Sequence, residues 1–374
     1  MTMMTPHVGL ERRVLDALEQ APARVVCVVG GCGTGRSTLL HAVADRLGRD
    51  TCQFIDVERA ASTPERFLRA VMQASPFLSP TTPHPPTSAR DAFDRLLRFF
   101  ATVSNDRPRT FLLDEVLASR TFESFPGLRH AQRELLAALV ASPHRFVLTS
   151  RFVRRTQHLL RDVASRIELI TLPALSADEV TAMLPPGPER DDERLSLGQT
   201  VQALTDGRAT YVHALVTAAS RMGTRSGDPI SALTALLTRD GDLAAWCAQR
   251  YEWRLQQARG YGALKAILEI LADAEPLNLT EIAQQMQRTP GSTKDYLSWL
   301  EDVDLVVSHQ KRYRFADPLL RLWVRLYCRP EPPSVDVVAR EVHAFAATRL
   351  PGASQATSLR ATGDRRAVGI IEID

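Results

Sequence analysis

Short apolar runs that alternate with helical segments are the feature that most limits the folds open to this chain. The runs are rich in β-branched residues and read as strands buried on both faces of a sheet; they cover residues 24–30, 52–57, 110–113, 146–149 and 167–172. Segments with helical spacing lie between them, at residues 37–47, 64–74, 89–103, 130–139 and 153–163. Strands that alternate with helices predict a parallel α/β sheet covered by helices on both faces.

The pattern changes after about residue 174. Helical segments then dominate, at residues 176–184, 195–204, 210–222 and 229–237. From about residue 251, three further helical segments precede two short strands around a basic turn within residues 305–315, which is the pattern of a winged helix. We therefore expect an α/β domain (1–174), a helical domain (175–250), a winged-helix domain (251–329) and a C-terminal tail (330–374).

Composition excludes several classes of protein. No run approaches the roughly 18 apolar residues of a membrane span, and the first ten residues lack the features of a secretion signal, so we expect a soluble, cytoplasmic protein. The five cysteines form no C-x-x-C pair, which argues against a zinc or disulfide framework. The net charge of only +3 provides no overall attraction to nucleic acid or anionic lipid.

A glycine-rich loop joins the first predicted strand to the following helix. It fits the phosphate-binding pattern G-x-x-x-x-G-K-[ST] except that arginine replaces the lysine, and its residues are Gly30, Gly31, Cys32, Gly33, Thr34, Gly35, Arg36, Ser37 and Thr38. Glycines let such a loop turn its backbone N–H groups around a phosphate, and the helix N-terminus favours the anion. Ser37 is the expected Mg²⁺ ligand, and Arg36 is expected to meet the β- and γ-phosphates. A glycine-rich turn that binds nothing is the alternative.

Two further strands end in polar residues. Asp114 and Glu115 follow the strand at 110–113, where one acid can act on Mg²⁺ and the next can polarise a water. The strand at 146–149 leads to Ser150 and Arg151, which can sense or neutralise a terminal phosphate. Ligands of open α/β folds bind at the carboxyl ends of the strands, so these residues and the glycine loop predict one site.

These motifs resemble those of the archaeal-type P-loop ATPases in the signal-transduction (STAND) class of AAA-related NTPases. The likeness also includes residues 7–11, similar to the family's F-V-G-R-E, and 149–151, its T-S-R. Residues 206–211 resemble its G-x-P motif, and 313–323 its Y-x-x-x-D-P-x-x-R-x-W. The resemblance implies an ASCE/AAA-like parallel-sheet P-loop NTPase domain followed by an all-helical lid and a winged helix.

The resemblance also implies the ligands ATP or ADP and Mg²⁺, with roles for individual residues. Ser37 and Asp114 would bind Mg²⁺, Glu115 would orient the attacking water, and Arg151 would contact the terminal phosphate. Arg36 stands where the family motif has lysine. Its planar guanidinium cannot reproduce a compact ammonium that bridges two phosphates. Leu10 and Ala209 replace an arginine and a proline of the family motifs.

Two functions from different classes therefore remain open. The first is a nucleotide-dependent switch with slow ATP hydrolysis, whose winged helix reports the nucleotide state to a protein partner or a second copy. The second is a non-hydrolysing scaffold whose winged helix binds DNA or protein. The predicted recognition helix, about 290–304, is acidic, so DNA contact would depend on the basic wing of Lys311, Arg312 and Arg314. The strand-like residues 368–374 faintly resemble the start of a nuclease motif, and we predict no nuclease activity from them.

Overall fold

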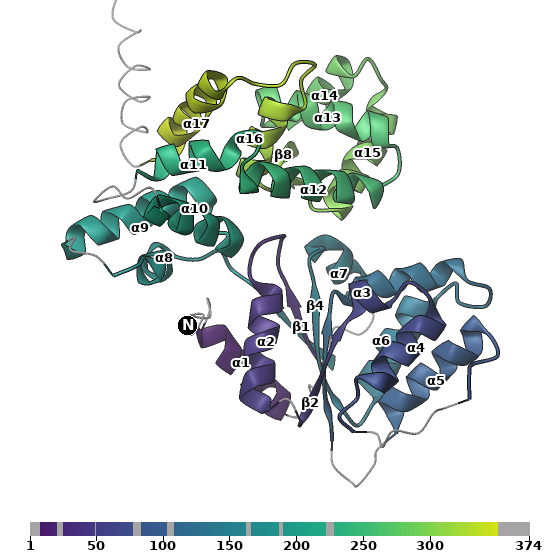
Figure 1. Cartoon of the computed structure of the whole chain (residues 1–374). Helices are drawn as coiled ribbons and strands as arrows, with labels where there is room; N and C mark the ends of the chain where they lie inside the picture. Colours follow the sequence, from purple (N-terminus) through teal and green to yellow (C-terminus); the bar gives the residue numbers. More distant parts are fainter. Residues whose placement is uncertain are drawn as a thin grey trace, which may run out of the picture. The chain divides into compact units, whose positions relative to one another are not determined.

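The computed structural model describes residues 8–20, 25–48, 50–77, 84–102, 108–161, 166–186, 190–221 and 228–350. The chain divides into two compact units, Met1–Pro173 and Ala174–Asp374 (Figure 1). The first contains a parallel sheet and its helices. In the second, the described residues are mainly helical.

Every pair of neighbouring strands in the first unit's sheet runs parallel. Its described strands are β1 (Val25–Val29), β2 (Cys52–Asp56), β3 (Thr110–Asp114), β4 (Arg145–Ser150) and β5 (Ile167–Thr171). They are arranged in the order β2-β3-β4-β1-β5. The parallel α/β sheet predicted from the sequence is therefore confirmed. Because β1 lies between β4 and β5, the loop that follows it begins between two neighbouring strands at the sheet's carboxyl edge.

Helices cover both faces of this sheet (Figure 1). On one face lie α1 (Val8–Glu19) and α2 (Arg36–Leu47), whose buried side chains form a core with those of β1. On the other face lie α4 (Pro64–Gln73), α5 (Ala89–Ala101) and α6 (Ala131–Ala141). Aromatic rings fill this second core: Phe111 of β3 stacks on Phe146 of β4 at 5.3 Å between ring centroids, and Phe100 of α5 meets both. Three shorter helices complete the unit: α3 (Val57–Ala60), the 3₁₀ helix η1 (Val116–Ser124) and α7 (Val153–Leu160).

The second unit begins with helices that start at well-formed caps. Ser176 accepts a hydrogen bond from the backbone N–H of Glu179, whose carboxylate accepts one from the N–H of Ser176, so a capping box starts α8. The helices of this part are α8 (Ala177–Met183), α9 (Asp191–Thr205), α10 (Ala209–Arg221), α11 (Pro229–Leu237) and α12 (Asp242–Gln256).

A small antiparallel sheet follows within the same unit. It has the order β6-β8-β7 and is formed by β6 (Leu277–Asn278), β7 (Val306–His309) and β8 (Arg312–Phe315). Three helices alternate with it along the chain, namely α13 (Tyr261–Ala274), α14 (Leu279–Gln285) and α15 (Pro290–Asp302). The two strands expected around the basic turn are thus present, and β6 is an additional strand that the sequence pattern did not indicate.

Asp317 links two distant segments of the second unit. It is only 2% exposed and caps α16 (Pro318–Tyr327), where its Oδ1 accepts from the N–H groups of Leu319 at 3.1 Å and Leu320 at 3.2 Å. Its Oδ2 accepts from the hydroxyl of Tyr211, in α10, at 2.8 Å, and Arg208 Nε lies 3.7 Å away. The segments 206–211 and 313–323, which were selected from the sequence as separate motifs, therefore meet at one buried carboxylate.

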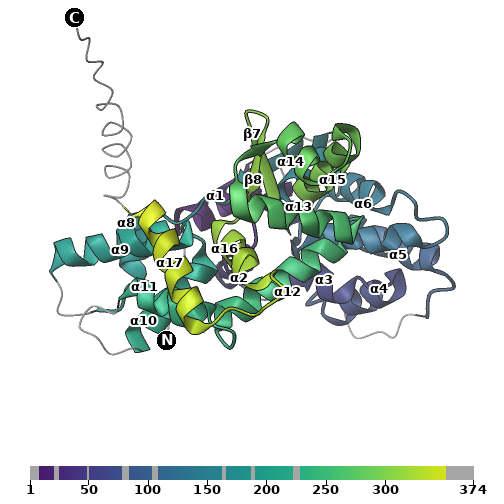
Figure 2. The ribbon, with the colours of Figure 1, turned by 90° about the horizontal axis from the view of Figure 1, so that it is seen from above.

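The predicted tail contains a helix that the sequence analysis did not include. This helix, α17 (Val335–Arg349), packs on α11 and α16 through Val338, Val342 and Ala346 (Figure 2). Residues 351–374, with the strand-like segment at 368–374, lie outside the described residues, as does His7 of the N-terminal motif. Within the described ranges, none of the helices combines the length and apolar character that a bilayer crossing requires.

Candidate functional site

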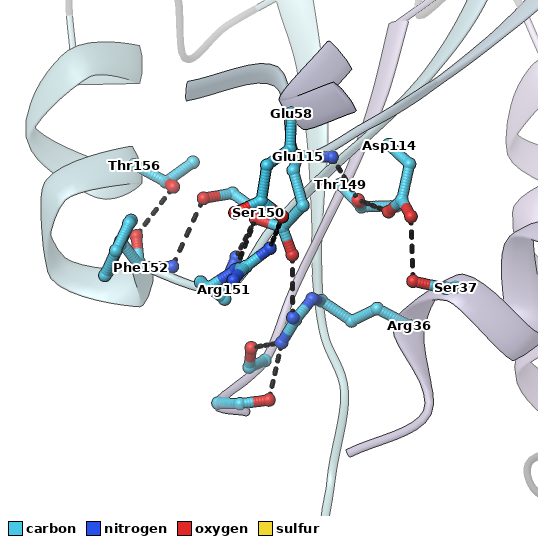
Figure 3. Close-up of polar contacts among 12 residues, drawn as sticks. Arg36, Ser37, Glu58, Asp114, Glu115, Thr149, Ser150, Arg151, Phe152 and Thr156 are labelled. Atoms are coloured by element: carbon cyan, nitrogen blue, oxygen red, sulfur yellow. Dashed lines mark hydrogen bonds and ion pairs between the residues drawn. The ribbon is translucent and has the colours of Figure 1, made fainter. Parts of the chain in front are cut away.

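Charged and hydroxyl side chains gather at the carboxyl edge of the first unit's sheet (Figure 3). Arg36 and Ser37 begin the helix after β1, Asp114 and Glu115 lie at the end of β3, and Arg151 follows β4. The strand order places β1, β4 and β3 side by side, which explains why residues so far apart in the sequence meet.

The backbone of the glycine loop has the conformation that its glycines permit. Gly33 and Gly35 have φ angles of 79° and 98°, in the left-handed region that side chains resist. Gly30 is required for a different reason. A Cβ atom there would lie 2.7 Å from the hydroxyl oxygen of Thr34 and 3.0 Å from Cβ of Leu172, so any side chain would displace the loop. Gly35 is the N-cap of α2 and provides no side-chain hydrogen bond to the first N–H groups of this helix, which have no acceptor within the helix.

The Asp114 carboxylate accepts hydrogen bonds from two hydroxyl groups, those of Ser37 and Thr149. The Ser37 hydroxyl donates to Asp114 Oδ2 at 2.8 Å. The Thr149 hydroxyl donates to Asp114 Oδ1 and accepts from the backbone N–H of Glu115 at 2.9 Å, which fixes the carboxylate at the end of β3. An adjacent hydroxyl and carboxylate are the hard oxygen donors that Mg²⁺ prefers, so the residues present fit this ion.

Arg36 does not point into an open phosphate site. Its side chain is 8% exposed and folds back over the loop, where NH1 donates to the carbonyl oxygens of Gly30 and Gly31. NH2 donates to Glu115 Oε1 at 2.8 Å. The planar fork thus joins the loop to the end of β3, which the sequence-based placement of Arg36 on phosphates did not anticipate. A lysine ammonium has no such fork and could not reach both partners in this way.

Glu115 is held between two arginines. Oε1 faces Arg36, and Oε2 lies 3.0 Å from Arg151 Nε and accepts from the Arg151 backbone N–H at 3.2 Å. Burial alone would raise the pKa of this carboxyl, but the charges of Arg36 and Arg151 outweigh it and hold the pKa below its usual value. The residue has φ 56°, an uncommon conformation for a non-glycine residue that concentrates at functional sites.

Arg151 also contacts a residue that the sequence analysis missed. Its NH2 group donates to Glu58 Oε2, from the short helix α3 that follows β2 (Figure 3). Burial of the Arg151 guanidinium disfavours its charge, yet the carboxylates of Glu115 and Glu58 outweigh this and raise its pKa. Glu58 belongs to no recognisable motif, and its only sequence signal is its place just beyond a predicted strand.

The structure therefore brings together Arg36, Ser37, Asp114, Glu115 and Arg151 at the edge of one sheet. Cys32 is buried, and Thr34 donates through its hydroxyl to the carbonyl of Gly31 at 2.9 Å. The arrangement offers a glycine-rich loop, a hydroxyl–carboxylate pair for a divalent cation and a buried carboxylate that could orient a water.

A comparison with solved structures identifies a protein with a similar fold. Over 86% of this chain and 96% of the other, the structure is similar to the Walker-type ATPase of Pyrococcus abyssi, with a TM-score of 0.64 and 17% sequence identity. At this identity the similarity establishes that the two proteins share a fold, and does not by itself establish what this chain binds.

Two other archaeal structures match over most of their length. One is the Orc1 protein of Aeropyrum pernix, solved in complex with DNA, at 16% identity and a TM-score of 0.47, covering 92% of this chain and 94% of that one. The other is Cdc6p of Pyrobaculum aerophilum, at 14% identity and a TM-score of 0.42, covering 93% and 96%. These TM-scores are too low to establish a shared fold. No protein-family model matches the sequence, and no curated protein matches it.

Proposed function

We propose that this chain is an ATP-binding P-loop NTPase that acts as a nucleotide-dependent switch with slow Mg²⁺-dependent ATP hydrolysis. The observation that carries the proposal is the 2.8 Å contact between Ser37 and Asp114, next to a loop in which Gly33 and Gly35 adopt left-handed φ angles. The fold shared with a Walker-type ATPase supports the same conclusion.

In this proposal each part of the site has a distinct task. The loop N–H groups and the N-terminus of α2 bind the phosphates, and Ser37 and Asp114 hold Mg²⁺, which neutralises phosphate charge when bound. Arg36 transfers its NH groups from the carbonyls of Gly30 and Gly31 to phosphate oxygens. Its departure from Glu115 leaves Oε1 able to accept a hydrogen bond from a water, while Arg151 keeps Oε2 in position. Because the arginine must first leave a buried ion pair, slow turnover is the expected behaviour.

In the proposed switch, the second unit reports the nucleotide state to a partner. We assign α8 to α12 to the lid, and the order α13, β6, α14, α15, β7, β8 to a winged helix, in which β7 and β8 form the wing. The helix in the recognition position, α15, carries Lys294 against Asp295, Glu301 and Asp302. In the wing, Arg312 is already engaged by Glu281 at 3.7 Å. These charges favour a protein partner or a second copy over DNA. In the wing, Lys311 and Arg314 are the cations left to contact a DNA phosphate.

A second candidate is supported by the Arg36–Glu115 ion pair. If this pair persisted with nucleotide bound, Glu115 could not activate water, and the chain would be a nucleotide-stabilised scaffold that does not hydrolyse ATP. The two candidates differ in turnover and agree in nucleotide binding.

Calorimetric titration with ATP and ADP, with and without Mg²⁺, tests the proposed function. We expect Mg²⁺-dependent binding and an increase in unfolding free energy of roughly 2.7 kcal/mol at about 100 times the Kd. The variant Ser37→Ala should lose the Mg²⁺ dependence, whereas Ser124→Ala, which removes an exposed hydroxyl from η1, should not. No heat and no thermal stabilisation at millimolar nucleotide would refute both candidates, and binding without phosphate release would leave only the second.

A further inference from the structure

Glu58 is placed at the site by strand register. Residues Asp56 of β2 and Asp114 of β3 are register partners, so the residues that follow the two strands lie at the same level of the sheet edge. Asp56 caps α3 by accepting from the N–H of Arg59 at 2.9 Å, which starts a helical turn directly after the strand. This turn presents Glu58 beside η1, within reach of Arg151.

Glu58 ends a chain of four alternating charges, Glu58–Arg151–Glu115–Arg36 (Figure 3). Two carboxylates and two guanidiniums balance one another. The side chains of Arg36, Glu115 and Arg151 are at most 9% exposed, whereas the Glu58 side chain is 39% exposed. Since water screens Glu58 and not the other three, Glu58 is the one member whose charge can be removed at little cost to folding.

The balance of charge changes when Arg36 turns to a phosphate, as the proposed function requires. Glu58 and Glu115 then compete for Arg151, the guanidinium that remains. The more strongly Glu58 holds Arg151, the less of its positive charge is available to a ligand at the adjoining loop. ATP and ADP differ in the outermost phosphate, which carries the additional negative charge, so the effect falls mainly on ATP.

We infer that Glu58 is a positioning residue that, by holding Arg151, sets how strongly this site distinguishes a nucleoside triphosphate from a diphosphate. This inference rests on the proposed function, because it concerns the same nucleotide site. It assigns Glu58 a role through Arg151 and not through contact with the nucleotide.

The test is the ratio of ATP to ADP affinity, measured by calorimetry with Mg²⁺ on the full chain and on Glu58→Gln. We expect the variant to bind ATP about three- to fivefold more tightly and ADP nearly as the parent does, the range for a partly screened charge pair. Glu65→Gln, which removes the same charge from the first turn of α4, is the matched control and should leave the ratio unchanged.

A double-mutant cycle separates action through Arg151 from a general charge effect. In an Arg151→Met background, Glu58→Gln should no longer change the ratio; Arg151→Lys provides a second background that retains the charge and loses the fork. An equal gain for ATP and ADP, or the same change in ratio without Arg151, would overturn the inference while the proposed function stands. If the parent chain bound neither nucleotide, the proposed function itself would fail and the inference with it.

Discussion

Replacing Arg36 by lysine separates the two tasks that its side chain performs. In the structure NH1 contacts the carbonyls of Gly30 and Gly31, and NH2 lies 2.8 Å from Glu115 Oε1. A lysine ammonium keeps the charge and can satisfy only one of these groups of partners at a time. Losing one charge-assisted hydrogen bond should lower the free energy of unfolding by about 1 to 3 kcal/mol. Arg36→Ala also removes the charge opposite a buried carboxylate and should lower the free energy of unfolding by a larger amount.

The same change is expected to preserve function. An ammonium still attracts the phosphates, so Arg36→Lys should retain ATP affinity. It should release phosphate at least as fast as the parent, because Glu115 Oε1 is no longer occupied by a guanidinium. Arg36→Ala should lose most nucleotide affinity under either candidate function.

The assay must report on the first unit separately. All four tryptophans, Trp246, Trp253, Trp299 and Trp323, lie in the second unit, so their fluorescence does not report on this site. Hydrogen exchange of peptides from β1 and β3, followed by mass spectrometry, measures the local opening free energy instead. Unchanged exchange in Arg36→Lys would show that the contact with Glu115 makes no net contribution. ATP binding by Arg36→Ala at parental affinity would show that residue 36 does not face the phosphates.

Two further predictions concern single carboxylates. Glu115→Gln should abolish phosphate release and leave nucleotide affinity largely intact, because the amide keeps the shape and loses the charge that polarises water; unchanged turnover would exclude Glu115 from the mechanism. Asp317→Ala should lower the unfolding free energy of the second unit by about 3 to 5 kcal/mol, since the largely buried guanidinium of Arg208 loses the carboxylate that most favours its charge, whereas Tyr211→Phe, which loses one hydroxyl, should lower it by about 1 kcal/mol. Tryptophan fluorescence during urea unfolding measures both, and equal losses in the two variants would contradict this reading of the cluster.

The sheet and its loop were predictable because their signals are local. A buried parallel strand needs a short β-branched run, and Val25 to Val29 provides one that is buried at every position. Asp114 and Arg151 were expected at one site because the carboxyl ends of parallel strands share one edge. Neither inference required knowledge of distant contacts.

The missed features depend on contacts that no local pattern encodes. The contact between Arg36 and Glu115 joins residues 79 positions apart in the chain, and a glutamate in sequence gives no sign of the left-handed backbone found at residue 115. The partner of Glu58, Arg151, directly follows β4, which lies two strands away from β2 in the sheet. Helix α17 follows a proline-rich stretch that suggested a tail, and it is stabilised by packing on α11 and α16.

The position of β1 in the sheet has a consequence for biosynthesis. Val25 pairs with Phe146 on one side and with Ile167 on the other, so the strand that leads into the loop has no partner among its immediate successors in the chain. Such non-local pairing is slow to form, and a ribosome delivers the loop long before the strands that flank it. A nascent chain that ends before β4 would hold every glycine of the loop and still lack the central sheet. In the proposed function, nucleotide would therefore assist the folding of the first unit only after β4 has been synthesised.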